Sequence, residues 1–136
     1  MAERKVRNIV VGGEAGQGLV TVGSLLARAL VRAGYRICVT QSYMSRIRGG
    51  HNTFAIRAGV EEVAAPQEAV DLLVALDAQT ISLHSGELSP GAVVVADSAH
   101  ASGCPGCLKV PLKELTQRRY ENVAALGVAA RLLGLR

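Results

Sequence analysis

Short apolar runs separated by glycine-rich or polar stretches form the basic pattern of this chain. Runs dense in valine, isoleucine and leucine predict buried strands, and they occupy Val6–Val11, Ile37–Thr40, Leu72–Leu76 and Ala92–Ala96. Between the first two runs, apolar residues recur at helical spacing, which predicts a helix over Leu19–Gly34 that ends in a glycine cap. The order of strand, glycine segment, helix and strand is that of a βαβ unit.

The remaining segments continue the alternation of strands and helices. Two further strands are expected, at Asn52–Ala58 and, more weakly, at Leu108–Leu112, where Pro111 favours a sheet edge. Other expected elements are a helix over Ala78–Leu88 capped by Asp77, a turn at Ser89–Gly91, a short helix around Lys113–Arg119, and a last helix over Asn122–Leu133 with Asn122 as its N-cap. We therefore predict a single domain over residues 1–136, of α/β class: a three-layer α/β/α domain with a mostly parallel sheet and a glycine loop after the first strand.

The composition agrees with a sheet that is buried on both faces. Hydrophobic residues make up 49% of the chain and aromatic residues only 3%, so the core is aliphatic, as in parallel sheets covered by helices. The formal charge of +4 is spread along the chain without interleaved aromatics, which argues against a nucleic-acid partner. The charged N-terminus leads into a strand and no apolar run reaches membrane-spanning length, so we expect a cytoplasmic protein without a membrane partner.

The glycine segment Gly12–Gly18 (GGEAGQG) joins the first strand to the first helix. Backbone N–H groups in such a segment, together with the helix N-terminus, favour an anionic ligand. The spacing G-x-x-G-x-G is not the dinucleotide fingerprint, and Gly18 is not followed by the Lys-Ser/Thr of a P-loop. Glu14 would also repel a phosphate. Two interpretations stay open: a coenzyme or anion site, and a tight turn required by strand–helix packing.

The second segment, Gln41–His51, is polar, basic and rich in glycine, and it predicts an exposed loop. Arg46 and Arg48 suit phosphate or carboxylate partners, and apolar side chains in the same loop are typical of an interaction site. We favour an interface or ligand loop over a merely solvated one. His51 has no identifiable Asp or Cys partner in the sequence, so we interpret it as structural and assign no catalytic residue.

The chain has three cysteines, Cys38, Cys104 and Cys107, and a low, odd number argues against the disulfide framework of a secreted domain. Cys104 and Cys107 have the C-x-x-C spacing of redox dithiols and of half a zinc site. A zinc site needs two more ligands, and a thioredoxin-like dithiol would precede a helix rather than a strand. We favour a turn that holds two cysteines, with no metal site, and keep a small redox protein as an alternative.

Three segments read together resemble the gamma subunit or gamma-type domain of 2-oxoacid:ferredoxin oxidoreductases: Gly12–Gly18, Gln41–Asn52 and Asn122–Leu135. The stretch Ser45–Asn52 (SRIRGGHN) is similar to that of 2-oxoglutarate-type and generic 2-oxoacid enzymes, in which the gamma domain is often fused ahead of the alpha domain. The family's glycine loop corresponds to Gly13, Glu14, Gly16, Gln17 and Gly18, which are the implied cofactor-binding residues. Its second loop, an implied interface or ligand loop, corresponds to Ser42, Arg46, Arg48, Gly49, Gly50, His51 and Asn52.

The resemblance implies a supporting role in the oxidative decarboxylation of a 2-oxoacid to an acyl-coenzyme A. Enzymes of this family use thiamine diphosphate with magnesium, and pass electrons through iron–sulfur clusters to ferredoxin. The chain has neither a GDG-type thiamine diphosphate motif nor four cysteines for a cluster. The implied partners are therefore alpha and beta subunits, and in some members delta, which carry these cofactors, while this chain contributes interfaces and helps to bind coenzyme A. A free-standing phosphate- or coenzyme-binding module is the alternative.

The chain ends at Arg136, whereas family gamma chains commonly continue well beyond the segment that matches Asn122–Leu135. We expect a shortened natural subunit, a truncated chain, or a piece of a longer fused chain.

Overall fold

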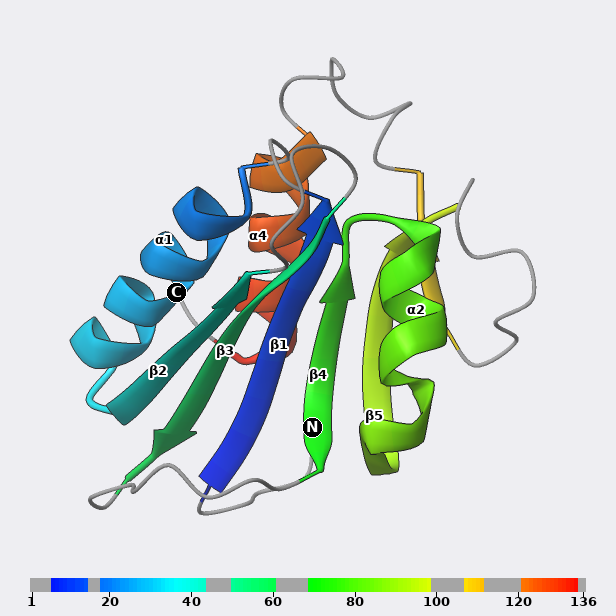
Figure 1. Ribbon diagram of the computed structural model, residues 1–136. Helices are drawn as coiled ribbons and strands as arrows, with labels where there is room; N and C mark the ends of the chain where they lie inside the picture. The colour runs from blue at the N-terminus through cyan, green and yellow to red at the C-terminus, as the bar shows by residue number, and fades with distance from the viewer. Residues whose placement is uncertain are drawn as a thin grey trace.

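A six-stranded sheet lies at the centre of the computed structural model, which describes residues 6–14, 18–43, 50–60, 69–98, 107–111 and 121–134. The strand order is β2-β3-β1-β4-β5-β6 (Figure 1). The strands are β1 (Val6–Glu14), β2 (Arg36–Tyr43), β3 (His51–Gly59), β4 (Val70–Ala75), β5 (Leu88–Asp97) and β6 (Leu108–Val110). The helices are α1 (Leu19–Arg32), α2 (Ala78–His84), the 3-10 turn η1 (Ser85–Glu87) and α4 (Glu121–Leu132).

One strand of this sheet, β3, runs against the others. β1, β4, β5 and β6 pair in parallel, whereas β3 pairs antiparallel with both β1 and β2. β1 and β2 therefore point the same way but are not neighbours, because β3 folds back from β2 and lies between them. The mostly parallel sheet is confirmed, and the expected βαβ unit is present with an antiparallel strand inserted in it.

Helices cover both faces of the sheet, which confirms the three-layer arrangement. α2 lies in front of the sheet in Figure 1, and α4 lies behind it together with α1. The apolar residues of α1 that face the sheet recur every three or four positions, as an amphipathic helix requires: Leu19, Val22, Gly23, Leu26, Ala27 and Leu30. The smaller layer under α2 is built on Val10, Val70, Leu73 and Val94. Every residue of the central strand β4 is buried.

A buried carboxylate joins three strands at the amino end of the sheet. Asp71 of β4 accepts hydrogen bonds from the backbone N–H of Asn8 and from the hydroxyl of Ser89, each at 2.9 Å. These contacts satisfy polar groups that water cannot reach. They also hold the start of β1 against β4 and β5, and so fix the strands whose other ends form the site described below.

The strand ends differ from the sequence prediction at both glycine-containing segments. β1 continues through Gly12 and Gly13 to Glu14, and the predicted loop Gln41–His51 loses its ends to β2 and β3. Antiparallel pairing is the cause, because β3 supplies partners for the end of β1: Thr53 for Gly12, Asn52 for Gly13 and His51 for Glu14. The glycine loop therefore begins later than the sequence suggested.

Two further predictions are wrong. Ser89–Gly91 is not a turn but part of β5, where Gly91 has a φ of 79° and the pairing with β4 shifts between Val70 and Leu72; a bulge thus keeps the strand continuous. Asn122 is not the N-cap of the last helix, because α4 already begins at Glu121. The helix expected around Lys113–Arg119 lies outside the described residues.

Candidate functional site

The carboxyl edge of the sheet brings together the two segments that the sequence singles out. The parallel strands β1, β2 and β4 end there, and β3 begins there because it runs the opposite way. Gly13 pairs with Asn52, and Glu14 pairs with His51. Open α/β sheets bind ligands at this edge, at the topological switch point, where the connections from two neighbouring strands pass to opposite faces of the sheet. Here α1 follows β1 on one face and α2 follows β4 on the other, so the switch point lies between β1 and β4.

The candidate residues differ in how they meet solvent. Gly13, Gly50 and His51 are buried, Gly18 and Asn52 are partly buried, and Glu14 and Ser42 are exposed. Ser42 lies near the end of β2, opposite Thr53 of β3. Five other candidates lie outside the described residues: Gly16, Gln17, Arg46, Arg48 and Gly49.

Two glycines of the first segment have a steric role. A Cβ on Gly12 would lie 2.4 Å from Cγ2 of Thr80, so only glycine lets α2 approach β1 this closely. The Gly12 carbonyl also accepts the N–H of Leu76 at 2.9 Å, which holds the start of the α2 connection against β1. Gly18 precedes α1 with a φ of 75°, in the left-handed region. Both observations support the packing interpretation of this segment, and they leave its ligand-binding role a prediction.

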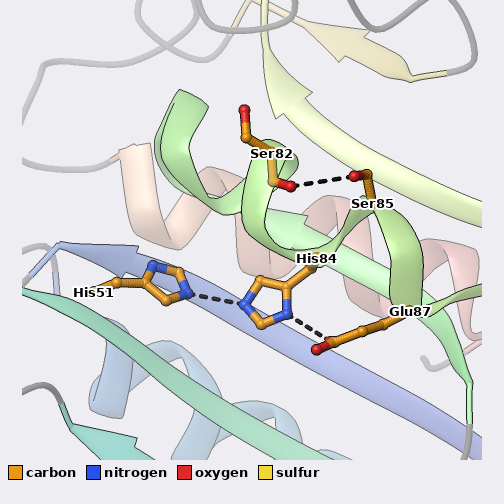
Figure 2. Close-up of polar contacts among 5 residues, drawn as sticks. All are labelled: His51, Ser82, His84, Ser85 and Glu87. Atoms are coloured by element: carbon orange, nitrogen blue, oxygen red, sulfur yellow. Dashed lines mark hydrogen bonds and ion pairs between the residues drawn. The ribbon is translucent and has the colours of Figure 1, made fainter.

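A chain of three polar side chains lies beside Gly12, and the sequence did not reveal it. Nε2 of His51 and Nε2 of His84 are 2.8 Å apart, and Nδ1 of His84 is 2.7 Å from Oε2 of Glu87 (Figure 2). Figure 2 shows the His51 ring over the end of β1, and its Cε1 lies 3.3 Å from the position of a Cβ on Gly12. The sequence offered His51 no Asp or Cys partner, and in the structure its side-chain partner is another histidine, His84.

The environment of His51 favours a neutral ring. Burial lowers the pKa of His51 from its ordinary value of 6.5, and the neighbouring His84 lowers it further, while Asp77 and Glu87 act in the opposite direction. Its Nδ1 atom is buried and has no hydrogen-bond partner among the described residues. A buried ring nitrogen of this kind costs free energy unless a hydrogen-bond partner reaches it.

A groove of about 600 Å³ runs over the sheet beside this histidine pair. Its floor is the part of the sheet that α2 leaves uncovered, and its wall includes His84 and Glu87. Cross-strand rows of the sheet form the floor: Ser42 with Thr53, Thr40 with Ala55 and Val10, and Cys38 with Arg57 and Asn8. The size is that of sites for small molecules or for side chains of a partner.

The two cysteines among the described residues differ in state. Cys107 is disulfide-bonded, whereas Cys38 is free and lines the groove. Within residues 6–14, 18–43, 50–60, 69–98, 107–111 and 121–134, no group of three or more His, Cys, Asp or Glu side chains could hold a metal ion.

None of the helices in those ranges is long and apolar enough to span a bilayer.

The fold and the site define an α/β domain whose carboxyl edge carries glycines, a histidine pair and an adjacent groove. Comparison with known proteins identifies its family. The pattern of the pyruvate ferredoxin/flavodoxin oxidoreductase family matches residues 8–136, and the chain belongs to that family. The family resemblance expected from the three sequence segments is confirmed.

Individual relatives refine this assignment. The chain is 29% identical over 134 residues to the 2-oxoglutarate synthase subunit KorC of Archaeoglobus fulgidus, a match that covers 94% of this chain and 71% of that subunit. Among solved structures, the 2-oxoglutarate:ferredoxin oxidoreductase of Magnetococcus marinus, with 2-oxoglutarate, coenzyme A and succinyl-CoA bound, matches with a TM-score of 0.82 and 25% identity over 94% of this chain and 24% of its own. The gamma subunit of a keto/oxoacid ferredoxin oxidoreductase from Geobacter sulfurreducens has the same fold, with a TM-score of 0.78, 24% identity and coverage of 96% and 78%.

The share of each relative that this chain covers varies widely. This chain spans only 12% to 22% of the curated 2-oxoacid:ferredoxin oxidoreductase alpha subunits that it matches. It spans most of the subunits that are separate chains, such as those from Archaeoglobus and Geobacter. The matching stretch thus makes up most of some relatives and a small part of others.

Proposed function

We propose that this chain is the gamma-type domain of a 2-oxoacid:ferredoxin oxidoreductase, and that it supports assembly and coenzyme A binding without performing the decarboxylation itself. Family membership over residues 8–136 supports the enzyme class. The observation that carries the proposal is the pairing of Glu14 with His51. It places the ends of two family segments, far apart in the sequence, at the edge where α/β sheets bind ligands.

The partners are the subunits that hold the redox and thiamine chemistry. Alpha and beta subunits, with delta in some assemblies, would carry thiamine diphosphate, magnesium and the iron–sulfur clusters, because this chain has only three cysteines and no GDG-type motif. The resemblance to KorC and to the Magnetococcus enzyme supports 2-oxoglutarate or a similar 2-oxoacid as the substrate of the assembly. A cytoplasmic location stays a prediction.

The two segments have separate roles in this proposal. The glycine segment, with Gly13, Glu14 and Gly18 at its described ends, receives the coenzyme together with Gly16 and Gln17. The second segment contacts the neighbouring subunits through Arg46 and Arg48, and its described ends Ser42, Gly50, His51 and Asn52 anchor it to β2 and β3. The groove beside them leaves room for a partner surface.

The experiment is an anaerobic pull-down of the tagged full chain from its native cell extract, followed by identification of the partners. We compare the wild-type chain with Arg48→Glu and with Arg36→Glu. Arg36 is exposed at the opposite end of β2, so it is a control with the same change of charge away from the carboxyl edge.

We expect the wild-type chain and Arg36→Glu to recover thiamine-diphosphate-binding and iron–sulfur subunits. Arg48→Glu should recover at least about tenfold less, because reversal of an interfacial charge costs more than about 1.4 kcal/mol. Equal recovery of both variants would rule out the interface role of the second segment. Recovery of the chain alone would favour a free-standing module, and direct titration with coenzyme A would then decide whether it binds.

A further inference from the structure

Glu87, His84 and His51 form a continuous hydrogen-bonded chain from the surface to the interior (Figure 2). The side chain of Glu87 is 56% exposed and that of His84 is 13% exposed, whereas His51 is only 7% exposed. The chain ends at Nδ1 of His51, the buried atom without a partner among the described residues. It has the form of a path between solvent and a single unpaired nitrogen.

The carboxylate of Glu87 fixes where the protons lie along this path. An ionised carboxylate can only accept, so Nδ1 of His84 carries a proton and donates it to Oε2 at 2.7 Å. A neutral imidazole has one N–H, so Nε2 of His84 is an acceptor, and Nε2 of His51 must be the donor across 2.8 Å. Neutral His51 therefore has its proton on Nε2, and its Nδ1 is a bare lone pair.

A proton that arrives at Nδ1 of His51 need not leave its charge there. Only one proton fits between two Nε2 atoms 2.8 Å apart, and it can move from His51 to His84. The positive charge then lies on His84, which is less buried and in contact with Glu87. Two other carboxylates lie near the ring of His51: Asp77, which caps α2 and raises the pKa of His51 more than Glu87 does, and Glu14, which is exposed on β1 at the position paired with His51. A histidine oriented and compensated by a carboxylate is the arrangement of known acid–base relays.

We propose that Nδ1 of His51 is an acid–base site for a weakly acidic O–H or S–H group brought to the end of β1, with His84 and Glu87 holding the charge that results. In the forward step the O–H or S–H bond breaks and its proton bonds to Nδ1 of His51. At the same time the Nε2 proton of His51 moves to Nε2 of His84. The products are the anion of the donor group and an imidazolium at His84 paired with Glu87, and the reverse step restores the starting state.

This inference goes beyond the supporting role proposed above, and it rests on that role only for what brings the O–H or S–H group to the end of β1. The proton positions belong to the chain itself. They are measured by NMR of the full chain with ¹⁵N-labelled histidine, because the ¹⁵N shifts distinguish the two tautomers and the charged ring. Ser85→Ala is the matched control: its hydroxyl donates to the carbonyl of Ser82 in the same turn, outside the path (Figure 2).

At pH 8 we expect His84 protonated on Nδ1 and His51 protonated on Nε2, in the wild type and in Ser85→Ala. On acidification the pair should take up one proton as a unit, which appears on Nδ1 of His51. Glu87→Gln should move this uptake to lower pH, by less than about one pH unit because Glu87 is 56% exposed, since a carboxylate that raises the pKa of His51 is gone. His51 protonated on Nδ1 at pH 8, separate uptake of two protons, or a Glu87→Gln curve identical to Ser85→Ala would each overturn the proposal.

A second measurement tests the acid–base role in the assembled oxidoreductase. The pH dependence of kcat/KM should shift along the pH axis in Glu87→Gln and stay unchanged in Ser85→Ala. A purely structural histidine pair, or one that is satisfied by an ordered water alone, would lower activity uniformly or not at all and would overturn the role. Recovery of partners in the pull-down does not depend on these protonation states, so failure of that proposal is distinguishable from failure of this one.

Discussion

Gly12 offers the sharpest test of the packing that builds the carboxyl edge. In Gly12→Ala the new methyl would lie 2.4 Å from Cγ2 of Thr80. Thr80 cannot rotate away, because it is fully buried and bonds to Oδ1 of Asp77 through its hydroxyl at 2.6 Å and its backbone N–H at 2.9 Å. The first turn of α2 must therefore move by about 1 Å, the difference between 2.4 Å and an ordinary contact of 3.4 Å.

The size of the effect follows from two opposing terms. Overpacking of a core costs about 1–3 kcal/mol, whereas alanine in a strand gains about 0.5–1 kcal/mol over glycine. We expect the free energy of unfolding to fall by about 1–2 kcal/mol, measured by urea unfolding with circular dichroism. Because His84 lies one helical turn after Thr80, the same shift should disturb the tautomer signals of the His51–His84 pair.

Thr80→Ser gives this prediction a matched rescue. Serine lacks Cγ2 but keeps the hydroxyl that bonds to Asp77, so alone it should cost about 1 kcal/mol for the lost methyl. In the double variant the alanine methyl occupies that space. The double variant should then be more stable than the sum of the two single changes predicts, by about 1–2 kcal/mol. Strictly additive losses, or a Gly12→Ala chain as stable as the wild type, would refute the reasoning.

Three other predictions use the same unfolding assay. Gly23→Ala should destabilise the chain by about 1–2 kcal/mol, because its Cβ would lie 2.3 Å from the buried ring of Phe54, whereas Gly127→Ala meets nothing within 4 Å and should stabilise it by up to about 1 kcal/mol; equal signs would contradict the close contact. Asp71→Ala should cost at least about 2 kcal/mol, because a buried donor and a partly buried donor lose their acceptor, and a loss below about 0.5 kcal/mol would show that they find another. The free energy of unfolding should fall as the pH drops below 6.5, by at most about 1.4 kcal/mol per pH unit, and level off below the lowered pKa of His51. The cause is that His51 in the unfolded chain binds a proton at a higher pH than in the folded chain. His51→Gln should remove this dependence, and an unchanged pH curve would contradict it.

Local pattern predicted most of the architecture. The helix over Leu19–Gly34 corresponds to α1, which ends at Arg32, and the apolar run Leu72–Leu76 corresponds to β4. These segments are long or uniformly buried, so their periodicity and composition report the tertiary environment directly. The turn expected at Ser89–Gly91 failed for the opposite reason. Serine, proline and glycine favour a turn locally, but the start of β5 tolerates them because a bulge absorbs the irregular backbone.

The histidine pair shows what no local pattern can supply. His84 and Glu87 are three residues apart, so their contact is accessible to a helix-spacing argument. Their meeting with His51, 33 residues from His84, depends on where β3 lies in the sheet. Had β2 paired directly with β1, as in a simple βαβ unit, β3 would not adjoin β1. His51 would then not pair with Glu14, and its ring would not lie beside Gly12. The antiparallel insertion of β3 thus creates both the meeting of the two family segments and the buried end of the proton path. A strand order that single-sequence reasoning could not derive therefore decides the chemistry of this edge.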